Sequence, residues 1–536
     1  MGDPPRYRVI DLGALAPRTA TYSPTTKAFG LNNRGEVVGE TTIAPPNSPQ
    51  PVLPLHAFVW LPVAHYGLNP GMTDLSVLSG FGMQSEAQEI NTPAGSAGPV
   101  IVGRQAFDFI GISETRPFVW NLAAPAEYVM LPTVCSQGPV GEVCGLNGVG
   151  YGVNDASPAV VVGAVETGLF CSGGTFGRPR LSAFRWTVGT NPAVLTLLSP
   201  LGGTLADDTS AANAINTLAT PDIVGYSDAC SEANACAAQR DAVRWTSTPL
   251  AAAFVKLPSG NETIATGANN AGSACGFGRI DGTSLSDCLQ RALMWSTPSA
   301  APFDLHTLGV PPLDGIEAST ANAISNVEPS SSMRRVVGQN VTSGAAIMWE
   351  SVNGVDWCYV NLNDDIGGCS STGWTLTVAN DVNDIGYVVG TGTRNGPPNR
   401  GFILACPFDV DLNGFVDGGD LGLVLSDWGV CPSYPRHCLA DVNCSGTVDG
   451  ADLGIVLSAW TGSTPCLAAL SCGIGEVAGA AAALAGQLEL PADPQQALML
   501  LGFESPESFG IWADSATATQ RANVLQALEA FLLDGE

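Results

Sequence analysis

Two stretches in the last quarter of the chain carry oxygen-bearing side chains at the spacing of a calcium loop. Residues 409–420 read DVDLNGFVDGGD, and residues 441–452 read DVNCSGTVDGAD. Side-chain oxygens stand at loop positions 1, 3, 5, 9 and 12, position 7 offers a backbone carbonyl, and glycine occupies position 6, where such loops turn sharply. These hard oxygen ligands suit Ca²⁺, so we predict two calcium sites. The predicted ligands are Asp409, Asp411, Asn413, Phe415, Asp417 and Asp420 in the first loop, and Asp441, Asn443, Ser445, Thr447, Asp449 and Asp452 in the second.

Each loop is followed at once by a predicted amphipathic helix. Apolar residues at i, i+3, i+4 and i+7 define one face of each helix, and Gly429 and Gly462 are expected to end them. The two apolar sets are Leu421, Val424, Leu425 and Trp428, and Leu453, Val456, Leu457 and Trp460.

This tandem loop–helix pattern, with Asp420 and Asp452 at position 12, is similar to the type I dockerin modules of exported bacterial proteins. The resemblance covers residues 406–466 and implies a calcium-dependent module with a cohesin-like or cell-surface partner. Positions 10 and 11 help to select the cohesin in dockerins. Here they read Gly418-Gly419 and Gly450-Ala451, without the hydroxyl groups usual in cellulosomal types.

A repeat fills the chain before these loops. A phrase such as AFGLN…VVG is followed by HAFVW and then by a DLxxL phrase, and the set recurs seven times. We name the four short apolar runs of each copy strands A (AIN-like), B (VVG-like), C (AFVW-like) and D (DLxxL-like). Seven copies of four short strands predict an all-β, seven-bladed β-propeller, with a β-solenoid or two packed sandwiches as alternatives. The leading asparagine of strand A stands at 32, 91, 154, 216, 269, 325/326 (as Ser-Asn) and 383.

The order of the phrases predicts how the ring closes. The chain opens with a D phrase at 11–15, whereas the last copy lacks one. We therefore expect residues 6–15 to pair with 400–404, because an open ring would leave two unpaired sheet edges. The predicted domains are the propeller (1–405), the calcium-loop module (406–466) and a helical C-terminal region (467–536) with an apolar stripe that contains Leu525 and Leu528.

The repeats over residues 7–404 resemble an extracellular family named for its His-Ala-Phe signature. Only the first copy keeps the histidine, at His56. The resemblance implies an exported propeller-like protein and carries no settled activity.

Fifteen cysteines include several close pairs. Short loops between them predict local disulfides and an oxidising, extracytoplasmic compartment. Zinc is the competing interpretation, which the absence of CxxC and the presence of only four histidines disfavour. The pairs are Cys135/Cys144, Cys230/Cys236, Cys275/Cys288, Cys358/Cys369, Cys431/Cys438 and Cys466/Cys472, with Cys171, Cys406 and Cys444 unassigned.

Composition limits the partners. The net charge is −28 and the chain contains two lysines, Lys27 and Lys256. Nucleic acids and anionic membrane surfaces need a basic surface, so neither is an expected partner. No stretch of about 20 apolar residues predicts a membrane span.

Catalytic patterns are scarce, and we predict no catalytic residues. None of the four histidines has an evident serine or cysteine partner. Paired carboxyls can hydrolyse glycosidic bonds when they converge, but Asp207-Asp208 and Asp364-Asp365 are expected to be solvated.

The prediction is therefore a secreted or surface, non-enzymatic protein that binds an unknown protein or glycan through its propeller and anchors or assembles through its calcium module. The alternative is an exported hydrolase or lyase that acts on polysaccharide. Its site would lie on the face formed by the B–C and D–A connections, which include the long loops (the long-loop face). Converging carboxylates with Tyr or Arg in a deep pocket of the A-strand channel would favour the alternative.

Overall fold

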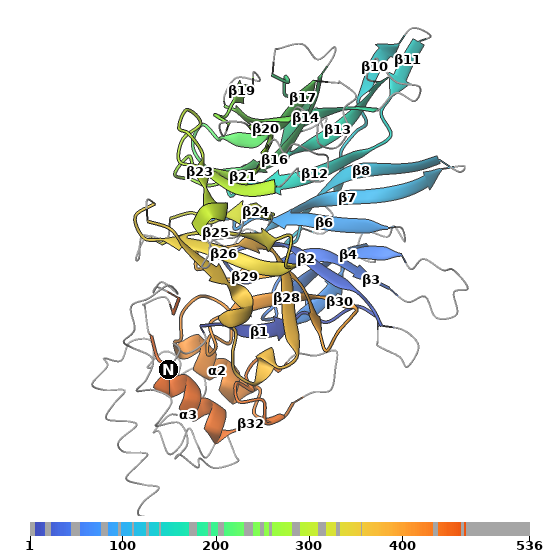
Figure 1. Ribbon diagram of the computed structural model, residues 1–536. Coiled ribbons are helices and arrows are strands. Elements are labelled where there is room, and N and C mark those ends of the chain that lie inside the picture. The colour runs from blue at the N-terminus through green and yellow to red at the C-terminus, as the bar shows by residue number, and fades with distance from the viewer. Residues whose placement is uncertain are drawn as a thin grey trace, which may run out of the picture.

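The computed structural model shows an all-β seven-bladed propeller with two α-helices among the residues that it describes (Figure 1). The described residues are 6–16, 23–43, 54–76, 84–94, 98–109, 112–124, 128–138, 141–170, 179–190, 195–201, 208–229, 240–246, 251–256, 260–280, 290–308, 318–327, 333–354, 356–431, 438–461 and 466–467. The predicted C-terminal helical region lies outside them from residue 468 onwards, as does the cysteine pair Cys230/Cys236.

Each blade is an antiparallel sheet of four strands, in the order A–B–C–D outward from the axis. The first three blades are β2 (Thr26–Leu31), β3 (Val37–Thr42), β4 (Leu55–Leu61) and β5 (Gly71–Asp74); β6 (Ser85–Ile90), β7 (Val100–Phe109), β8 (Ile112–Asn121) and β9 (Val129–Met130); and β12 (Gly148–Val153), β13 (Val160–Phe170), β14 (Pro179–Thr187) and β15 (Thr196–Leu197). The next three are β16 (Asp208–Ile215), β17 (Ile223–Ala229), β18 (Arg240–Trp245) and β19 (Ala252–Ala253); β20 (Gly260–Ala268), β21 (Ala274–Ile280), β22 (Gln290–Trp295) and β23 (Phe303–Asp304); and β24 (Ser319–Ile324), β25 (Arg334–Asn340), β26 (Ala345–Ser351) and β27 (Cys358–Asn361).

The seventh blade confirms the predicted closure. It consists of β28 (Trp374–Val382), β29 (Val388–Arg394), β30 (Asn399–Ala405) and, as its outer strand, β1 (Arg8–Asp11) from the start of the chain. The register runs from Arg8 opposite Ala405 to Asp11 opposite Phe402. The N-terminal segment therefore covers an edge that β30 would otherwise expose.

Every A strand carries a β-bulge at the same place. Between Ala28 and Gly30 the pairing of β2 with β3 skips Phe29, and the other six A strands skip the equivalent residue. A bulge bends the strand and redirects its side chains. The skipped residues are Phe29, Gln88, Tyr151, Asn213, Thr266, Asn322 and Asn380.

The glycine of each VVG phrase lies opposite this bulge. A Cβ atom on Gly39 would come within 2.0 Å of the Lys27 carbonyl oxygen, which no side chain can tolerate. The equivalent glycines at 103, 163, 225, 276, 338 and 390 would meet an A-strand carbonyl at 1.8–2.1 Å. The motif therefore contains glycine because the bulged A-strand backbone passes too close for any other residue.

Two sets of hydrogen bonds join the A–B turns around the axis. In the first set, the leading asparagine donates from Nδ2 to the carbonyl of its counterpart in the next blade, as Asn91 does to Asn154 at 2.8 Å; blade 6 has Ser325 at this position. The second set is a closed ring, because the backbone N–H of each following residue donates to a side chain of the next blade. Its members are Asn33, Thr92, Asp155, Thr217, Asn270, Asn326 and Asp384.

The C-terminal segment packs directly on the propeller. The helices α2 (Gly418–Ser426) and α3 (Gly450–Ser458) lie below β1 and β28 in Figure 1, and β31 (Gly429–Val430) pairs with β32 (Thr447–Val448). One continuous hydrophobic core joins Leu421, Val424 and Val456 to blade 7. Both helices end earlier than the apolar stripes predicted, at Ser426 and Ser458. Trp428 and Trp460 follow the helix ends and still pack against the core.

The disulfides agree with the predictions in part. Cys135–Cys144, which closes the hairpin of β10 (Cys135–Gly138) and β11 (Gly141–Cys144), and Cys431–Cys438 are confirmed. Three predicted pairings are wrong, because Cys369 is bonded to Cys444, Cys466 is bonded to Cys406, and Cys275 is a buried free thiol. Sequence proximity could not reveal the first two bonds, since Cys369 and Cys444 meet only when the module packs on the propeller, and Cys406 and Cys466 stand at opposite ends of the module. None of the described helices has the length and apolar content needed to cross a bilayer.

Candidate functional site

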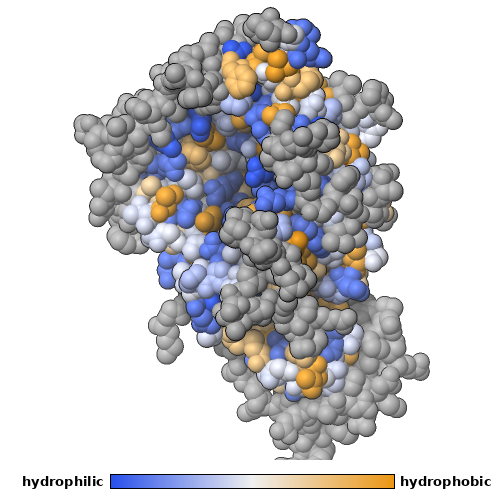
Figure 2. Space-filling model, turned by 90° about the vertical axis from the view of Figure 1, so that its right-hand side faces the viewer, coloured by the Kyte–Doolittle hydropathy of each residue, from blue (hydrophilic) through white to orange (hydrophobic). Residues whose placement is uncertain are grey.

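A cavity of about 360 Å³ lies on the propeller axis and is lined by the A strands. Its lining begins at the bulged residues, such as Phe29 and Tyr151, and extends to A–B turn residues such as Asp384. It therefore occupies the half of the channel next to the A–B turns, opposite the long-loop face on which the hydrolase alternative placed the site. Figure 2 looks onto the long-loop face, where hydrophilic residues surround a recess near the centre.

Two carboxyl groups reach this cavity from the position that follows the bulge. Five blades carry a small residue there: Gly30, Gly152, Ala214, Gly267 and Ala323. Blade 2 carries Glu89 and blade 7 carries Asp381, the blades on either side of blade 1.

Both acids converge on Gly30 of blade 1. A Cβ atom at Gly30 would lie 2.9 Å from Glu89 Oε1, so the glycine leaves the space that the Glu89 carboxyl fills. From the other side, Asp381 Oδ2 accepts a hydrogen bond from the Leu31 N–H at 2.8 Å. The bulge and the missing side chain at Gly30 together bring the two carboxyls into one part of the cavity.

The pKa values of the two carboxyls are both raised, but the groups around them differ. Burial, with repulsion from Asp381 and Asp155, raises the pKa of Glu89 well above its ordinary range. Burial also raises the pKa of Asp381, but only to about 6, because the N–H groups of Leu31 and Val382 stabilise its carboxylate. The pKa of Glu89 is raised by burial and by neighbouring carboxylates, whereas two N–H groups stabilise the Asp381 carboxylate, so the pair suits a proton donor next to a proton acceptor.

The remaining walls are polar but carry no basic side chain. Asn213, Asn322 and Asn380 each donate to a carbonyl of the next blade, at 2.6–2.8 Å, and so hold the A strands together. Burial raises the pKa of Tyr151 to about 12, so its hydroxyl stays protonated and lines the cavity as a neutral group. Among the described lining residues there is no Lys, Arg or His.

The residues considered for catalysis from the sequence do not lie here. His56 Nδ1 is 2.8 Å from Asp74 Oδ2 within blade 1, and His306 Nδ1 is 2.8 Å from Ser319 Oγ in the 3₁₀ turn Leu305–Leu308. Asp365 pairs with Arg6, and Asp207 lies outside the described residues. The sequence does mark the two cavity acids in strand A. Every repeat has Gly or Ala before the last apolar residue of this strand, except AQEIN, which has Glu89 there, and ANDVN, which has Asp381.

The first predicted calcium loop brings three of its carboxylates together. Oxygen atoms of Asp409, Asp411 and Asp420 all lie within 4.8 Å of one another. Asp409 and Asp420 are buried, and Asp417 instead caps α2 with its side chain on the Gly419 N–H. Burial, followed by repulsion from Asp420 and Asp409, raises the pKa of Asp411 to about 9. Burial and the neighbouring Asp409 raise the pKa of Asp420 to about 7.

The backbone of the loop is folded around these carboxylates. Asp409 accepts from the N–H groups of Asn413 and Gly414, while Asp420 accepts from those of Val410, Asp411 and Asp417. Asn413 donates to Asp411 at 3.1 Å and accepts from the Phe415 N–H at 2.9 Å. Three close carboxylates with raised pKa values, two buried and one partly buried, match what a divalent cation would stabilise, so the donor set of this loop fits Ca²⁺.

The second loop repeats the pattern in a more exposed setting. Asp441 accepts from the N–H groups of Ser445 and Gly446, and Asp452 accepts from those of Asn443 and Asp449. Ser445 and Gly446 are exposed, and the Thr447 carbonyl accepts the Ser445 hydroxyl. Asp441 also lies close to Cys431 and Cys438, but those sulfur atoms form a disulfide and are not available as ligands.

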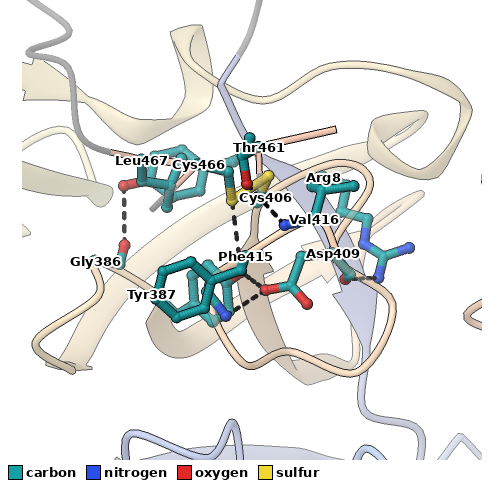
Figure 3. Close-up of a disulfide and its surroundings, with 12 residues drawn as sticks. Arg8, Gly386, Tyr387, Cys406, Asp409, Phe415, Val416, Thr461, Cys466 and Leu467 are labelled. Carbon is teal, nitrogen blue, oxygen red and sulfur yellow. Dashed lines mark hydrogen bonds between the residues drawn. A yellow bond between two sulfur atoms is a disulfide. The ribbon is translucent and has the colours of Figure 1, made fainter. Parts of the chain in front are cut away.

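The first loop is bonded to the propeller (Figure 3). Tyr387 of blade 7 donates its hydroxyl proton to Asp409, and Arg8 of β1 donates to the Asp409 carbonyl at 2.6 Å. Arg8 also donates to the Leu439 carbonyl at 3.0 Å, and the Cys406–Cys466 disulfide lies beside this contact. The loop therefore shares buried polar contacts with the blade that closes the ring.

Sialidases are among the solved structures that resemble this chain. The Hadza microbial sialidase Hz136 gives a TM-score of 0.33 at 9% identity and covers 72% of this chain and 66% of its own. The Trypanosoma rangeli sialidase gives a TM-score of 0.32 at 10% identity; the match covers 60% of this chain and 54% of that one. Its complex with sialic acid gives a TM-score of 0.32 at 10% identity; the match covers 65% of this chain and 58% of that one. The chain thus spans less than two thirds of the length of these structures. No protein-family model and no curated protein matches the sequence.

The prediction of a non-enzymatic binding protein is wrong. The similar structures are enzymes, and the channel cavity is lined by two converging carboxyls and by Tyr151, the residue types expected of the hydrolase alternative, although away from the long-loop face where that alternative placed the site. At this TM-score and identity the likeness itself gives the chain neither a substrate nor a mechanism. The chemistry below therefore rests on the channel.

Proposed function

We propose that this protein is a hydrolase that acts on glycosidic bonds of a polysaccharide, with Glu89 and Asp381 as its carboxyl pair. The observation that carries the proposal is their convergence on Gly30 in a cavity of about 360 Å³, where burial raises the pKa of both carboxyls and N–H groups of Leu31 and Val382 stabilise the Asp381 carboxylate. Glycosidases use one protonated and one ionised carboxyl across the scissile bond. The cavity volume lies within the range of small-molecule sites.

In the proposed reaction Glu89 is the general acid and Asp381 the general base. Glu89 gives its proton to the glycosidic oxygen as the bond from that oxygen to the anomeric carbon breaks. Asp381 takes a proton from the water whose oxygen bonds to the same carbon. One water is consumed, and transfer of the proton from Asp381 to solvent and from solvent to Glu89 restores the starting state.

The test is cleavage of polysaccharides by the full chain and by Glu89→Gln and Asp381→Asn. Each substitution keeps the size of the side chain and removes proton transfer, so we expect each to lower kcat by at least about 100-fold. Asp356→Asn, on an exposed turn, is the matched control and should leave the rate unchanged. Cleavage that survives both channel substitutions would rule the assignment out.

We also propose that residues 409–420 and 441–452 bind Ca²⁺ through the predicted ligands, as in the dockerin-like module that the sequence resembles. The close carboxylates of the first loop and the same backbone pattern in the second support this. Calorimetry with Ca²⁺ should find two sites. Asp409→Ala should abolish the tighter one and Asp441→Ala the weaker, because the first loop presents more carboxylates. A single site, or the reverse order, would contradict the ranking.

The other predictions are kept as proposals. The repeats are of the His-Ala-Phe type, the divisions fall at 405 and 466, and the protein is exported. Four disulfides among the described residues support an oxidising compartment. A cohesin-like or cell-surface partner for the module stays a prediction, and a binding assay with immobilised cohesins would test it.

A further inference from the structure

Four carboxyl groups line the axial cavity without a basic neighbour. They belong to Glu89, Asp155, Asp381 and Asp384. Within the described residues, no Lys, Arg or His forms an ion pair with any of them. An excess of one charge in a site with low-dielectric walls concentrates ligands of the opposite charge.

Only neutral donors compensate these four groups. Asp384 accepts from Asn33 Nδ2 at 2.8 Å and from the Asn326 N–H at 3.0 Å, and Asp155 accepts from the Thr92 N–H at 2.6 Å. Glu89 accepts from the adjacent Ile90 N–H at 3.0 Å. Hydrogen bonds from uncharged groups stabilise a carboxylate but leave its negative charge in the cavity, as at Asp155, Asp381 and Asp384.

Two buried glutamates outside the cavity have arginine partners. Glu350, fully buried, lies 3.0 Å from the Arg335 guanidinium and 3.2 Å from that of Arg6. Glu262, 2% exposed at its side chain, lies 3.0 Å from the Arg279 guanidinium. Arginines therefore neutralise Glu350 and Glu262, whereas among the described residues none is paired with the four cavity acids, so the negative potential of the cavity is left for a ligand.

We propose that the ligand is cationic, and specifically that the glycan substrate carries free amino groups, as a glucosamine polymer does. This inference rests on the proposed function, because it names the substrate of the same cavity. An ammonium group would take the place that arginine holds beside Glu350 and Glu262. Hydroxyl groups of the sugar would meet the amides and the Tyr151 hydroxyl of the wall.

The geometry favours a molecule over a bare metal ion. In the described part of the chain, the three-carboxylate group that could share one ion is in the first calcium loop, and the cavity acids form no such group. A volume of about 360 Å³ is also far larger than one ion needs. Anionic sugars should be repelled, so sialic acid, bound in one of the similar structures, does not match this lining.

The test uses three oligosaccharides with the full chain in excess Ca²⁺. They are a glucosamine oligomer, the N-acetylglucosamine oligomer with the same backbone and blocked amines, and a glucuronic acid oligomer. Calorimetry on the Glu89→Gln protein measures binding without turnover, slightly above pH 6, where more than half of Asp155 and of Asp381 is ionised. We expect the glucosamine oligomer to bind at least about tenfold more tightly than the acetylated one, and the acidic one not at all. The preference should shrink as salt is added.

Asp155→Asn removes one cavity charge while its amide oxygen can still accept from Thr92, so it should weaken binding of the glucosamine oligomer several-fold and leave that of the acetylated oligomer unchanged. An unchanged melting temperature would show that the ring is intact.

Equal affinity for the first two oligomers, or tighter binding of the acidic one, would overturn the inference. If neutral polysaccharides are cleaved as fast as amino-bearing ones, the inference fails and the hydrolase stands. If the glucosamine oligomer binds selectively but no glycan is cleaved, the hydrolase fails and the inference stands.

Discussion

The Tyr387 hydroxyl donates a hydrogen bond to the Asp409 carboxylate and so joins the seventh blade to the first residue of the first calcium loop. Both side chains are fully buried. Arg8, from the strand that closes the ring, donates to the carbonyl of the same aspartate. The closing blade and the loop therefore share one polar cluster, and a change in either should be measurable in the other.

Tyr387→Phe should lower the free energy of unfolding by about 1.5–3 kcal/mol, the usual worth of a hydrogen bond to a charged group. Phenylalanine keeps the ring in the core and removes only the hydroxyl. Urea denaturation in the presence of Ca²⁺ measures the loss. A double-mutant cycle with Asp409→Asn is the control, because the two effects should be strongly non-additive. Simple additivity would mean that the contact contributes little.

Arg8→Ala should cost roughly 3 kcal/mol, because it leaves the buried carbonyl of Asp409 and the partly buried carbonyl of Leu439 without their donor. Arg104→Ala is the matched control, since Arg104 forms an ion pair with Glu86 in which its side chain is 46% exposed, and should cost at most about 1 kcal/mol. Equal losses from the two substitutions would contradict the proposed role of Arg8.

Hydrolysis should follow a bell-shaped pH profile. Activity should fall as pH drops below about 6, because Asp381 must be ionised, and should fall at high pH as Glu89 loses its proton. Steady-state kcat/KM across pH tests this. The acid limb should vanish from the residual activity of Asp381→Asn but persist in that of Glu89→Gln. An acid limb retained by Asp381→Asn would assign it to another group.

Stability should depend on pH through the same residue. The native pKa of Asp381, about 6, lies above the ordinary aspartate value of about 3.9, so the folded state binds a proton more tightly than the unfolded state. Its contribution is complete below about pH 4 and is lost as pH rises through about 6. Asp381→Asn should therefore be more stable relative to the natural protein at pH 7 than at pH 4. Thermal melts at both values, in Ca²⁺, measure the difference.

Two disulfides should be found by mass mapping without reduction: Cys369–Cys444, which joins the propeller to the module, and Cys406–Cys466, which joins the two ends of the module. Replacing Cys406 and Cys466 together by serine should cost about 2–4 kcal/mol, because the bond closes a long loop. Linkage of Cys369 to Cys358 in the natural protein would contradict the pairing.

The fold could be predicted from the sequence because its causes are local and repeated. The VVG glycines, the apolar C strands and the unmatched D phrase at 11–15 predicted seven blades and the closing strand. The site could not be predicted in this way. Glu89 and Asp381 are separated by about five repeats, and only the ring brings them to Gly30. Their chemistry also depends on burial, which a sequence does not display. The same holds for Cys369–Cys444, whose partners meet only through the packing of the module.

The bulge falls at one position in all seven A strands. The side chains that follow it, one from each blade, therefore determine which chemical groups reach the axial cavity. Their order around the circle follows their order in the sequence. Exchanging whole blades would therefore move an acid in steps of one seventh of a turn while the surrounding ring of hydrogen bonds stayed the same. The order of the repeats therefore determines the angle between the two proposed catalytic groups around the axis. Gly152 and Ala214 occupy the same position in their blades, so further side chains could be introduced there.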